Sequence, residues 1–281
     1  MEQRRYGTTD EMLSIVGFGG ILVMNESAET SSRLVSQAID RGINYYDVAP
    51  SYGNAEEMLG PALEPYRKDV FLACKTQKRT AEEAQEELHR SLELLRTDHF
   101  DLYQLHSVTT REDVDTILGP GGAMETFLKA RDQGKVRYLG FSAHSEEAAL
   151  ALLDAFSFDS ILFPINWVTW LKGKFGPRVL PKAKEKGAAI LALKTLAKRT
   201  WRENEERTFD KTWYHPVDTY EEALLGFRFT MSRGVTAAVT PGHEKFLWWA
   251  CDAAEEYTPL SAEEEAQLAE RAKELDPIFA V

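Results

Sequence analysis

Residues 42–60, GINYYDVAPSYGNAEEMLG, join an apolar run to a polar loop and then to a helical pattern. The run at 43–47 is apolar and β-rich until its last residue, the carboxylate Asp47. Tyr52 follows five residues later in a loop flanked by glycine. Short apolar runs of this kind are typical of parallel strands that are covered on both faces. The stretch therefore predicts a buried strand with an acid and a phenol at its carboxyl end.

Seven further runs along the chain have the same character. They span residues 14–20, 69–75, 100–106, 136–142, 160–166, 188–194 and 235–241. Helical patterns lie between them, and the clearest, at 80–96, places Ala84, Leu88, Leu92 and Leu95 on one face. Eight strand candidates repeating every ~30 residues give a total of roughly 250 residues, the usual size of a (β/α)8 barrel. The sequence thus predicts an α/β fold, a (β/α)8 TIM barrel, as a single domain over residues 1–281.

A doubly wound open sheet is the competing architecture. The segment GFGGILVM at 17–24 lacks the G-x-G-x-x-G spacing that binds dinucleotides in such sheets, which favours the barrel. No linker rich in proline, glycine and serine divides the chain. Two long segments, 106–122 and 194–218, follow the fourth and seventh strands, and long loops at such positions usually shape a site.

Composition excludes several classes of function. The net charge of -12 and the dispersed lysines argue against binding to nucleic acid. No run approaches the roughly 18 apolar residues of a spanning helix, so we expect no membrane partner. The two cysteines, Cys74 and Cys251, fit neither a disulfide framework nor a metal site. We therefore expect a cytoplasmic protein without a metal; the sequence does not indicate its oligomeric state.

Polar residues end most of the predicted strands. They are Asp47, Lys75, His106, Ser142, Asn166 and Lys194. The carboxyl ends of all strands meet at one face of a barrel, the face that carries barrel active sites. Residues far apart in the sequence are therefore expected to surround one mouth.

Four of these groups form a coherent acid catalyst. If Asp47 keeps Lys75 charged beside Tyr52, the pKa of the tyrosine falls from its usual value. A fall of about two units requires roughly 3 kcal/mol, which a desolvated lysine can supply. His106 would then polarise a carbonyl oxygen at the same point. Taken singly, the four residues fit a cap, a surface lysine, a rim histidine and a packing tyrosine equally well; together they favour catalysis.

A proton donor at a carbonyl oxygen is useful when a nucleophile attacks the carbonyl carbon. None of the four groups supplies a hydride, so a reductase would require a nicotinamide cofactor. A Schiff-base lyase or aldolase using Lys75 or Lys194 is a weaker alternative, because Asp47 would keep Lys75 charged and poorly nucleophilic.

At these residues the sequence closely resembles the aldo-keto reductase superfamily, (β/α)8 oxidoreductases that use NAD(P)H. The resemblance rests on segments 42–60, 70–75, 94–106 and 134–144 and extends over essentially the whole chain. It implies that Tyr52 is the general acid, that Lys75 lowers its pKa, that Asp47 holds Lys75 and that His106 orients the carbonyl. The implied substrate is a small aldehyde or ketone, of a kind the sequence does not specify.

The cofactor region departs further from the family pattern. Ser142 matches the serine for the nicotinamide carboxamide, but Ala143 replaces an asparagine and Leu193 stands where an aromatic plate is common. Lys194 is implied to meet the pyrophosphate. Trp248 and Asp252 stand where the family usually has the residues for the adenosine end, and Lys245 either replaces the missing cation for a 2'-phosphate or is simply solvated. The implied cofactor-binding residues are Gly19, Gly20, Asp47, Ser142, Asn166, Leu193, Lys194, Thr195, Gly242, Lys245 and Asp252. NADPH is the expected cofactor, with NADH possible.

These departures leave a second hypothesis open, a nucleotide-binding regulatory module on the same barrel with negligible turnover. Aromatic residues follow the sixth and seventh strands and are expected either to pack the long loop or to wall a substrate pocket. They are Trp167, Trp170, Trp201, Trp213 and Tyr214. His144 and His215 are expected to hydrogen-bond within loops rather than to bind metal, since neither has a second ligand at useful spacing.

Overall fold

Eight parallel strands close into a barrel in the computed structural model, which describes all 281 residues. Their order around the barrel is β12, β3, β4, β5, β6, β7, β8, β9. Their bounds are β3 (Val16–Gly19), β4 (Tyr45–Asp47), β5 (Phe71–Thr76), β6 (Phe100–Val108), β7 (Val136–Ala143), β8 (Ser160–Pro164), β9 (Ala189–Leu193) and β12 (Ala237–Val239). Every strand overlaps one of the predicted runs, and the predicted (β/α)8 barrel is confirmed.

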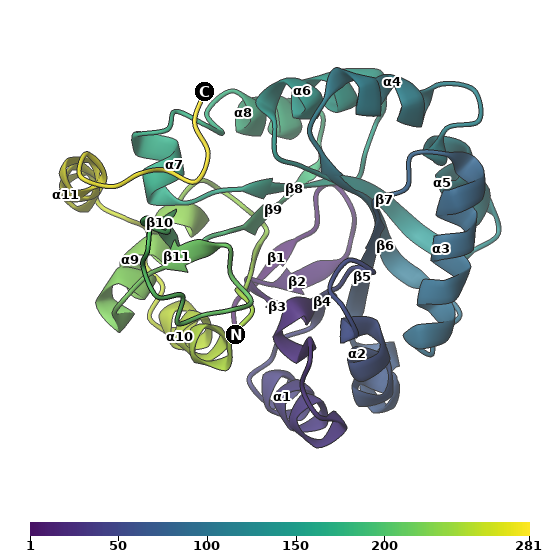
Figure 1. Ribbon diagram of the computed structural model, residues 1–281, viewed down its shortest axis with the longest axis horizontal. Coiled ribbons are helices and arrows are strands. Elements are labelled where there is room, and N and C mark those ends of the chain that lie inside the picture. Colours follow the sequence, from purple (N-terminus) through teal and green to yellow (C-terminus); the bar gives the residue numbers. More distant parts are fainter.

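Helices surround the barrel (Figure 1). Their bounds are α1 (Ala28–Asp40), α2 (Ala55–Leu63), α3 (Ala81–Leu94), α4 (Arg111–Leu118), α5 (Ala123–Asp132), α6 (Glu146–Ala155), α7 (Trp167–Leu171), α8 (Val179–Glu185), α9 (Tyr220–Met231), α10 (Glu244–Glu255) and α11 (Ala262–Ala272). Two 3-10 helices are η1 (Gly20–Val23) and η2 (Glu64–Asp69). The helix predicted at 80–96 is α3, and it buries Ala84, Leu88 and Leu92 as its apolar spacing requires.

Burial divides the apolar side chains into two layers. Successive side chains of a strand point to opposite faces of the sheet. In β4, Tyr45 therefore belongs to the cluster of 10 residues inside the barrel, whereas Tyr46 belongs to the cluster of 64 residues between strands and helices. Cys74 lies in the same outer cluster, as its alternation with Lys75 predicts.

Two small antiparallel sheets were not predicted. One pairs β1 (Gln3–Arg5) with β2 (Met12–Ser14); Leu13 of β2 and Tyr6, which follows β1, join the interior cluster of the barrel. The other pairs β10 (Ala197–Thr200) with β11 (Tyr214–Pro216), inside the segment expected to be a long loop. Helix α4 likewise occupies part of the loop expected after the fourth strand. Elements this short have too few residues for a clear hydrophobic period.

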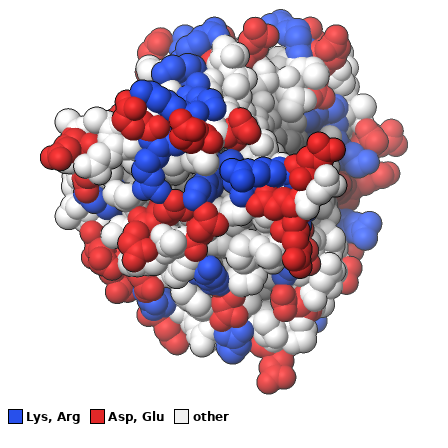
Figure 2. Space-filling model, turned by 60° about the vertical axis from the view of Figure 1, so that its left-hand side comes forward, with Lys and Arg blue, Asp and Glu red and all other residues white.

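Charged side chains of both signs cover the surface. On the face shown in Figure 2, lysine and arginine side chains lie among aspartate and glutamate side chains. That face carries no extended area of positive charge alone. None of the helices has the length and apolar composition needed to cross a bilayer.

The amino-terminal end of β6 carries a buried charge network. Asp101 is 5% exposed and pairs with Arg67 at 3.0 Å and with Arg137 at 2.7 Å. The same carboxylate accepts a hydrogen bond from the backbone N–H of Leu72 in β5 at 2.9 Å. Residues at this end of a barrel serve stability rather than chemistry.

Substitution Asp101→Ala is expected to lower the free energy of unfolding by about 3–5 kcal/mol, because it leaves Arg67 buried without a counter-charge. Asp115→Ala is the control, since it removes an exposed ion pair with Arg111 and is expected to cost about 0–1 kcal/mol. Urea unfolding of both variants measures the difference; equal costs would contradict a structural role for the Asp101 network.

Candidate functional site

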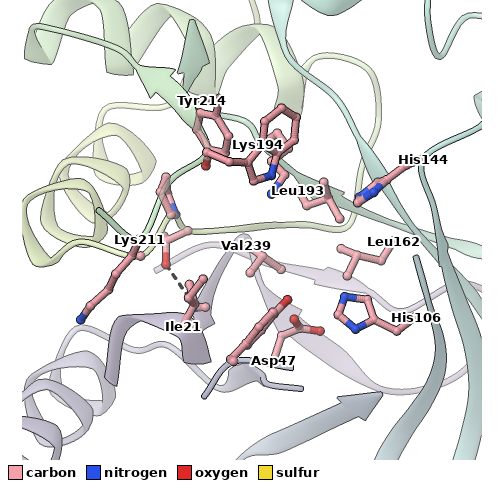
Figure 3. Close-up of a pocket in the computed structure, with 16 residues that line it drawn as sticks. Ile21, Asp47, His106, His144, Leu162, Leu193, Lys194, Lys211, Tyr214 and Val239 are labelled. Carbon is pink, nitrogen blue, oxygen red and sulfur yellow. Dashed lines mark hydrogen bonds between the residues drawn. The ribbon is translucent and has the colours of Figure 1, made fainter. Parts of the chain in front are cut away.

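A cavity of about 200 Å³ opens at the carboxyl end of the barrel strands. Figure 3 shows side chains from several strand ends around it, among them Asp47, His106 and Leu193. The lining residues are Gly19, Ile21, Asp47, Tyr52, His106, His144, Leu162, Leu193, Lys194, Lys211, Trp213, Tyr214, Val239, Thr240, Pro241 and Gly242. Strands distant in sequence thus contribute to one site.

Strand alternation explains why the polar strand ends point inward. Tyr45 in β4 and Ala73 in β5 belong to the interior cluster, so the residues two positions later, Asp47 and Lys75, point the same way. Leu102 in β6 is also interior, which sends Gln104 inward. Strands β4, β5 and β6 therefore pack the barrel with apolar side chains below and place polar ones at their carboxyl ends.

Asp47 and Lys75 form a buried ion pair. The Lys75 ammonium is fully buried and donates hydrogen bonds to a carboxylate oxygen of Asp47 and, at 3.1 Å, to the carbonyl of Val48. The other carboxylate oxygen accepts hydrogen bonds from the Tyr45 hydroxyl at 3.2 Å and the Gln104 amide at 3.0 Å. Burial alone would lower the pKa of Lys75, but the attraction of Asp47 raises it above its usual value. The lysine therefore stays charged.

Tyr52 lies against this pair. The Lys75 ammonium is 5.1 Å from the centre of the Tyr52 ring, and that ring meets the His106 ring edge-on at 5.8 Å. Burial is the largest influence and raises the pKa of Tyr52, Lys75 opposes it, and the result lies above the usual value. The predicted fall in the tyrosine pKa is wrong, because burial and the negative charge of Asp47 raise this pKa by more than Lys75 lowers it.

His106 lies at the start of a β-bulge in β6. Leu105 pairs with Phe141 and Val108 with Ala143, so β6 carries one extra residue relative to β7. Ser107, in the bulge, has a φ of 56°, which is uncommon for a residue with a side chain. Alternation already turns His106 inward, two positions after Gln104, and the bulge interrupts the regular pairing directly after it.

Three side chains hold the bulge. The Ser142 hydroxyl accepts a hydrogen bond from the Ser107 N–H at 2.7 Å, and the Ser107 hydroxyl lies 2.9 Å from Nδ1 of His144. The Arg79 guanidinium donates to the His106 carbonyl at 2.9 Å and is itself held by Asp113 of α4 at 3.0 Å. Arg79 therefore connects α4 and the loop after β5 to the backbone that carries His106.

The two cavity histidines are neutral at physiological pH. Burial, followed by the positive charge of Lys75, holds the pKa of His106 well below its usual value. Burial and Lys194 lower the pKa of His144 to about 4. A neutral imidazole can donate one hydrogen bond and accept another.

The segment between β10 and β11 closes one side of the cavity. Lys211 reaches across to η1, where it donates to the Leu22 carbonyl at 2.9 Å and to Glu26 at 2.7 Å. A Cβ atom at Gly242 would lie 2.7 Å from the Lys211 Cβ, so only glycine fits beneath this segment. Trp213 and Tyr214 of the same segment line the cavity.

The remaining predicted aromatic residues serve packing. Trp201 packs against the His215 ring in a tilted arrangement, with ring centres 4.6 Å apart, and donates to the Thr212 carbonyl. Trp167 and Trp170 both lie in α7. Trp167 belongs to a small buried cluster with residues of α9 and α11, and Trp170 packs against that cluster. The expectation of an aromatic pocket wall thus holds for Trp213 and Tyr214 alone.

The predicted cofactor residues are divided between the cavity and its surroundings. Gly19, Asp47, Leu193, Lys194 and Gly242 line the cavity. The cavity wall does not include Gly20, Ser142, Asn166, Thr195, Lys245 or Asp252. Asp252 pairs with Arg41 at 2.7 Å.

Several lining residues were not predicted as site residues. Ile21, Leu162, Val239 and Lys211 belong to this group, and His144 was expected only as a loop hydrogen-bonder. Leu162 and Val239 could have been found from alternation, because they belong to or pack against the interior cluster near the strand ends. No group of three or more His, Cys, Asp or Glu side chains is arranged to hold a metal ion.

Comparison with known proteins agrees with this architecture. Residues 16–275 match the Aldo/keto reductase family. Aldo-keto reductase YhdN of Bacillus subtilis is 31% identical over 208 residues, which are 68% of this chain and 60% of that protein. The uncharacterized oxidoreductase YqkF of the same organism is 33% identical over 157 residues, 51% of this chain and 49% of that protein. These matches thus span about half to three fifths of the relatives' own length.

Solved structures share the whole fold. Aldo-keto reductase AKR11C1 from Bacillus halodurans, in its holo form, superposes with a TM-score of 0.77 at 24% identity. That alignment covers 97% of this chain and 96% of the other. With the family match over residues 16–275, the chain belongs to the Aldo/keto reductase family.

Proposed function

We propose that this protein is an oxidoreductase that reduces an aldehyde or ketone to an alcohol with a nicotinamide cofactor, NADPH in preference to NADH. One observation carries the proposal. Tyr52, His106 and Asp47 line a single cavity, and Lys75 is buried against Asp47 and Tyr52, although the four come from different strands and loops. The family match and the relatives named as oxidoreductases support the same reaction class.

Buried polar groups near the cavity fit such a cofactor. The side-chain amide nitrogen of Asn166 is buried without a hydrogen-bond partner. It could donate a hydrogen bond to the carboxamide of a bound nicotinamide. At Gly242 the absence of a side chain leaves backbone beside the cavity, just before the first turn of α10, where free N–H groups favour phosphate. A bound nicotinamide would supply the hydride. We propose that Ser142 and Asn166 hold the nicotinamide and that the backbone at Gly242 holds the cofactor's phosphates.

Lys245 is our candidate for the 2'-phosphate. Its ammonium lies 4.2 Å from the centre of the Trp249 ring and has no carboxylate partner. The two neighbouring arginines are already paired, Arg33 with Glu244 at 2.8 Å and Arg41 with Asp252 and Glu255. Lys245 is therefore the cation of this surface that remains available for a phosphate.

Tyr52 acts as the proton donor in this proposal. Its raised pKa keeps the hydroxyl protonated at neutral pH, so the acid is present before reaction. As the carbonyl oxygen gains negative charge, the phenol gives up its proton and the Lys75 ammonium stabilises the phenolate. Asp47 fixes that ammonium and keeps it charged.

His106 orients the carbonyl. Its imidazole is neutral, and its ring packs edge-on against Tyr52, so both can reach one oxygen atom. A neutral imidazole donates a hydrogen bond to the oxygen without competing for the tyrosine proton.

The alternative function is nucleotide binding with negligible turnover. The departures from the family pattern at Leu193, Ala143, Trp248 and Asp252 motivate it. Tight NADPH binding without turnover of any aldehyde or ketone, together with a captured protein partner, would favour it.

We also expect the protein to act in a reducing cytoplasm, in keeping with two buried, unpaired cysteines.

Substitution Tyr52→Phe is expected to lower kcat for carbonyl reduction by about 100- to 10,000-fold, because it removes the proton donor. NADPH consumption over a panel of aldehydes and ketones measures this, and NADPH fluorescence checks that cofactor affinity is retained. Equal rates for the two proteins would refute the role of Tyr52.

Substitution Arg79→Met is expected to lower kcat/KM by about 10- to 100-fold, because the backbone that carries His106 loses its anchor and the imidazole shifts. Arg79→Lys is expected to recover part of the loss. The control is Arg111→Met, which removes the exposed ion pair between Arg111 and Asp115 on α4, the helix that also carries Asp113. A purely structural role for Arg79 would instead lower stability and leave kcat/KM of the folded protein unchanged.

A further inference from the structure

Strand alternation turns His144 into the cavity. Phe141 and Ala143 of β7 belong to the outer cluster between strands and helices, so Ser142 and His144 point the other way, toward the barrel axis. The backbone N–H of His144 donates to the Val108 carbonyl at 3.2 Å, which continues the pairing of β6 and β7 beyond the bulge. His144 accordingly lines the cavity, although no step of the proposed reaction uses it.

One nitrogen of the His144 ring is held and the other is free. The Ser107 hydroxyl lies 2.9 Å from Nδ1, and the Phe279 ring packs against the imidazole with ring centres 5.2 Å apart. These two contacts fix the orientation of the ring. Nε2 has no hydrogen-bond partner, and it is not sealed in the interior as the unpaired side-chain nitrogens of Asn166 and Trp167 are. Nε2 therefore remains available to a ligand of the cavity.

His144 lies next to the proposed reaction centre. The pairing of residue 105 with residue 141 brings His106 level with Ser142, so His144, two residues further on, is the diagonal neighbour of His106 on the same face. Diagonal neighbours lie about 7–8 Å apart, within reach of aromatic side chains. In Figure 3, His144 and His106 occupy the same side of the cavity, with Leu162 between them in this view. His144 is also nearer the mouth than Ser142, the residue proposed for the nicotinamide.

The state of the His144 ring favours a hydroxyl group as its ligand. Burial, followed by the charge of Lys194, lowers the pKa of His144 to about 4, so the imidazole carries no charge that would attract an anion at neutral pH. The Ser107 hydroxyl can pair with Nδ1 in either tautomer, which leaves Nε2 as a single donor or a single acceptor. A hydroxyl group can both accept and donate a hydrogen bond, so it fits Nε2 in both tautomers.

We infer that His144 is a specificity-determining residue that hydrogen-bonds a neutral hydroxyl group of the substrate. The inference rests on the proposed function, because it takes the ligand of the cavity to be an aldehyde or ketone. The substrate class is then a hydroxyaldehyde or hydroxyketone. Since His144 and His106 are diagonal neighbours, the hydroxyl lies only a few bonds from the carbonyl group that meets Tyr52 and His106.

The test compares 4-hydroxy-2-butanone with 2-butanone, two ketones that differ by one hydroxyl group. The wild type is expected to have the higher kcat/KM for the hydroxyketone. His144→Phe keeps an aromatic ring and removes both nitrogens, so this preference is expected to fall about 3- to 10-fold, the range for one neutral hydrogen bond. No preference in the wild type, or an equal preference in His144→Phe, would overturn the inference.

Two further variants separate hydrogen bonding from cavity shape. His144→Gln retains a donor and an acceptor and is expected to recover part of the preference for the hydroxyketone. Leu162→Val is the matched control, because it alters the shape of the same wall without removing a polar group. It is expected to change kcat/KM for the two ketones by the same factor and so to leave the preference unchanged. A fall in the preference as large as that of His144→Phe would contradict a role for the imidazole.

A binding measurement separates this inference from the reductase function. 15N NMR of the histidine rings, with His144→Phe used to assign the signal, reports on Nε2 without turnover. In the presence of NADPH, 1,3-butanediol is expected to shift that signal and 2-butanol, which lacks the second hydroxyl, to leave it nearly unchanged; equal shifts would overturn the inference. Reduction of 2-butanone by the wild type tests the reductase function separately, since this ketone has no hydroxyl group for His144 to bind.

Discussion

The ion pair between Asp47 and Lys75 is the constraint on which the site depends. Two charges buried at the end of a barrel are costly unless each is fully paired and hydrogen-bonded. Asp47 meets this condition with three donors, and Lys75 uses the Val48 carbonyl as well. The geometry of Lys75 is therefore fixed by its surroundings, and the position of Tyr52 is defined relative to a fixed positive charge.

Strand alternation supplies most of the site, and an interruption of that alternation at the end of β9 adds Lys194. Asp47, Lys75 and Gln104 point inward simply because the apolar residues two positions before them do. His106 follows the same alternation, two positions after Gln104, and only the next residue, Ser107, is left-handed. Lys194 is itself left-handed at the end of β9 and lines the cavity. Regular strands thus build the ion pair and turn His106 inward, whereas local backbone strain accompanies the inward position of Lys194.

The sequence predicted what has a strong local signal. All eight barrel strands were found from apolar runs, and the four proposed catalytic groups from the polar residues at their ends and from the family resemblance. The hairpin of β10 and β11 was missed because its strands are short and polar. Lys211 was missed because its contacts with Leu22 and Glu26 join segments far apart in the chain. The predicted direction of the shift in the Tyr52 pKa was wrong, because the burial that raises it depends on the folded cavity and cannot be predicted from local sequence.

The influence of Lys75 on Tyr52 is the central claim, and the pKa of the Tyr52 hydroxyl tests it most directly. It can be measured by 13C NMR of labelled tyrosine, with Tyr52→Phe used to assign the signal. The comparison is with the double variant Asp47→Asn, Lys75→Met, which removes both charges and keeps the buried site balanced. The account predicts a higher pKa for Tyr52 in the double variant, because the stabilising ammonium is lost. An unchanged or lower pKa would contradict it.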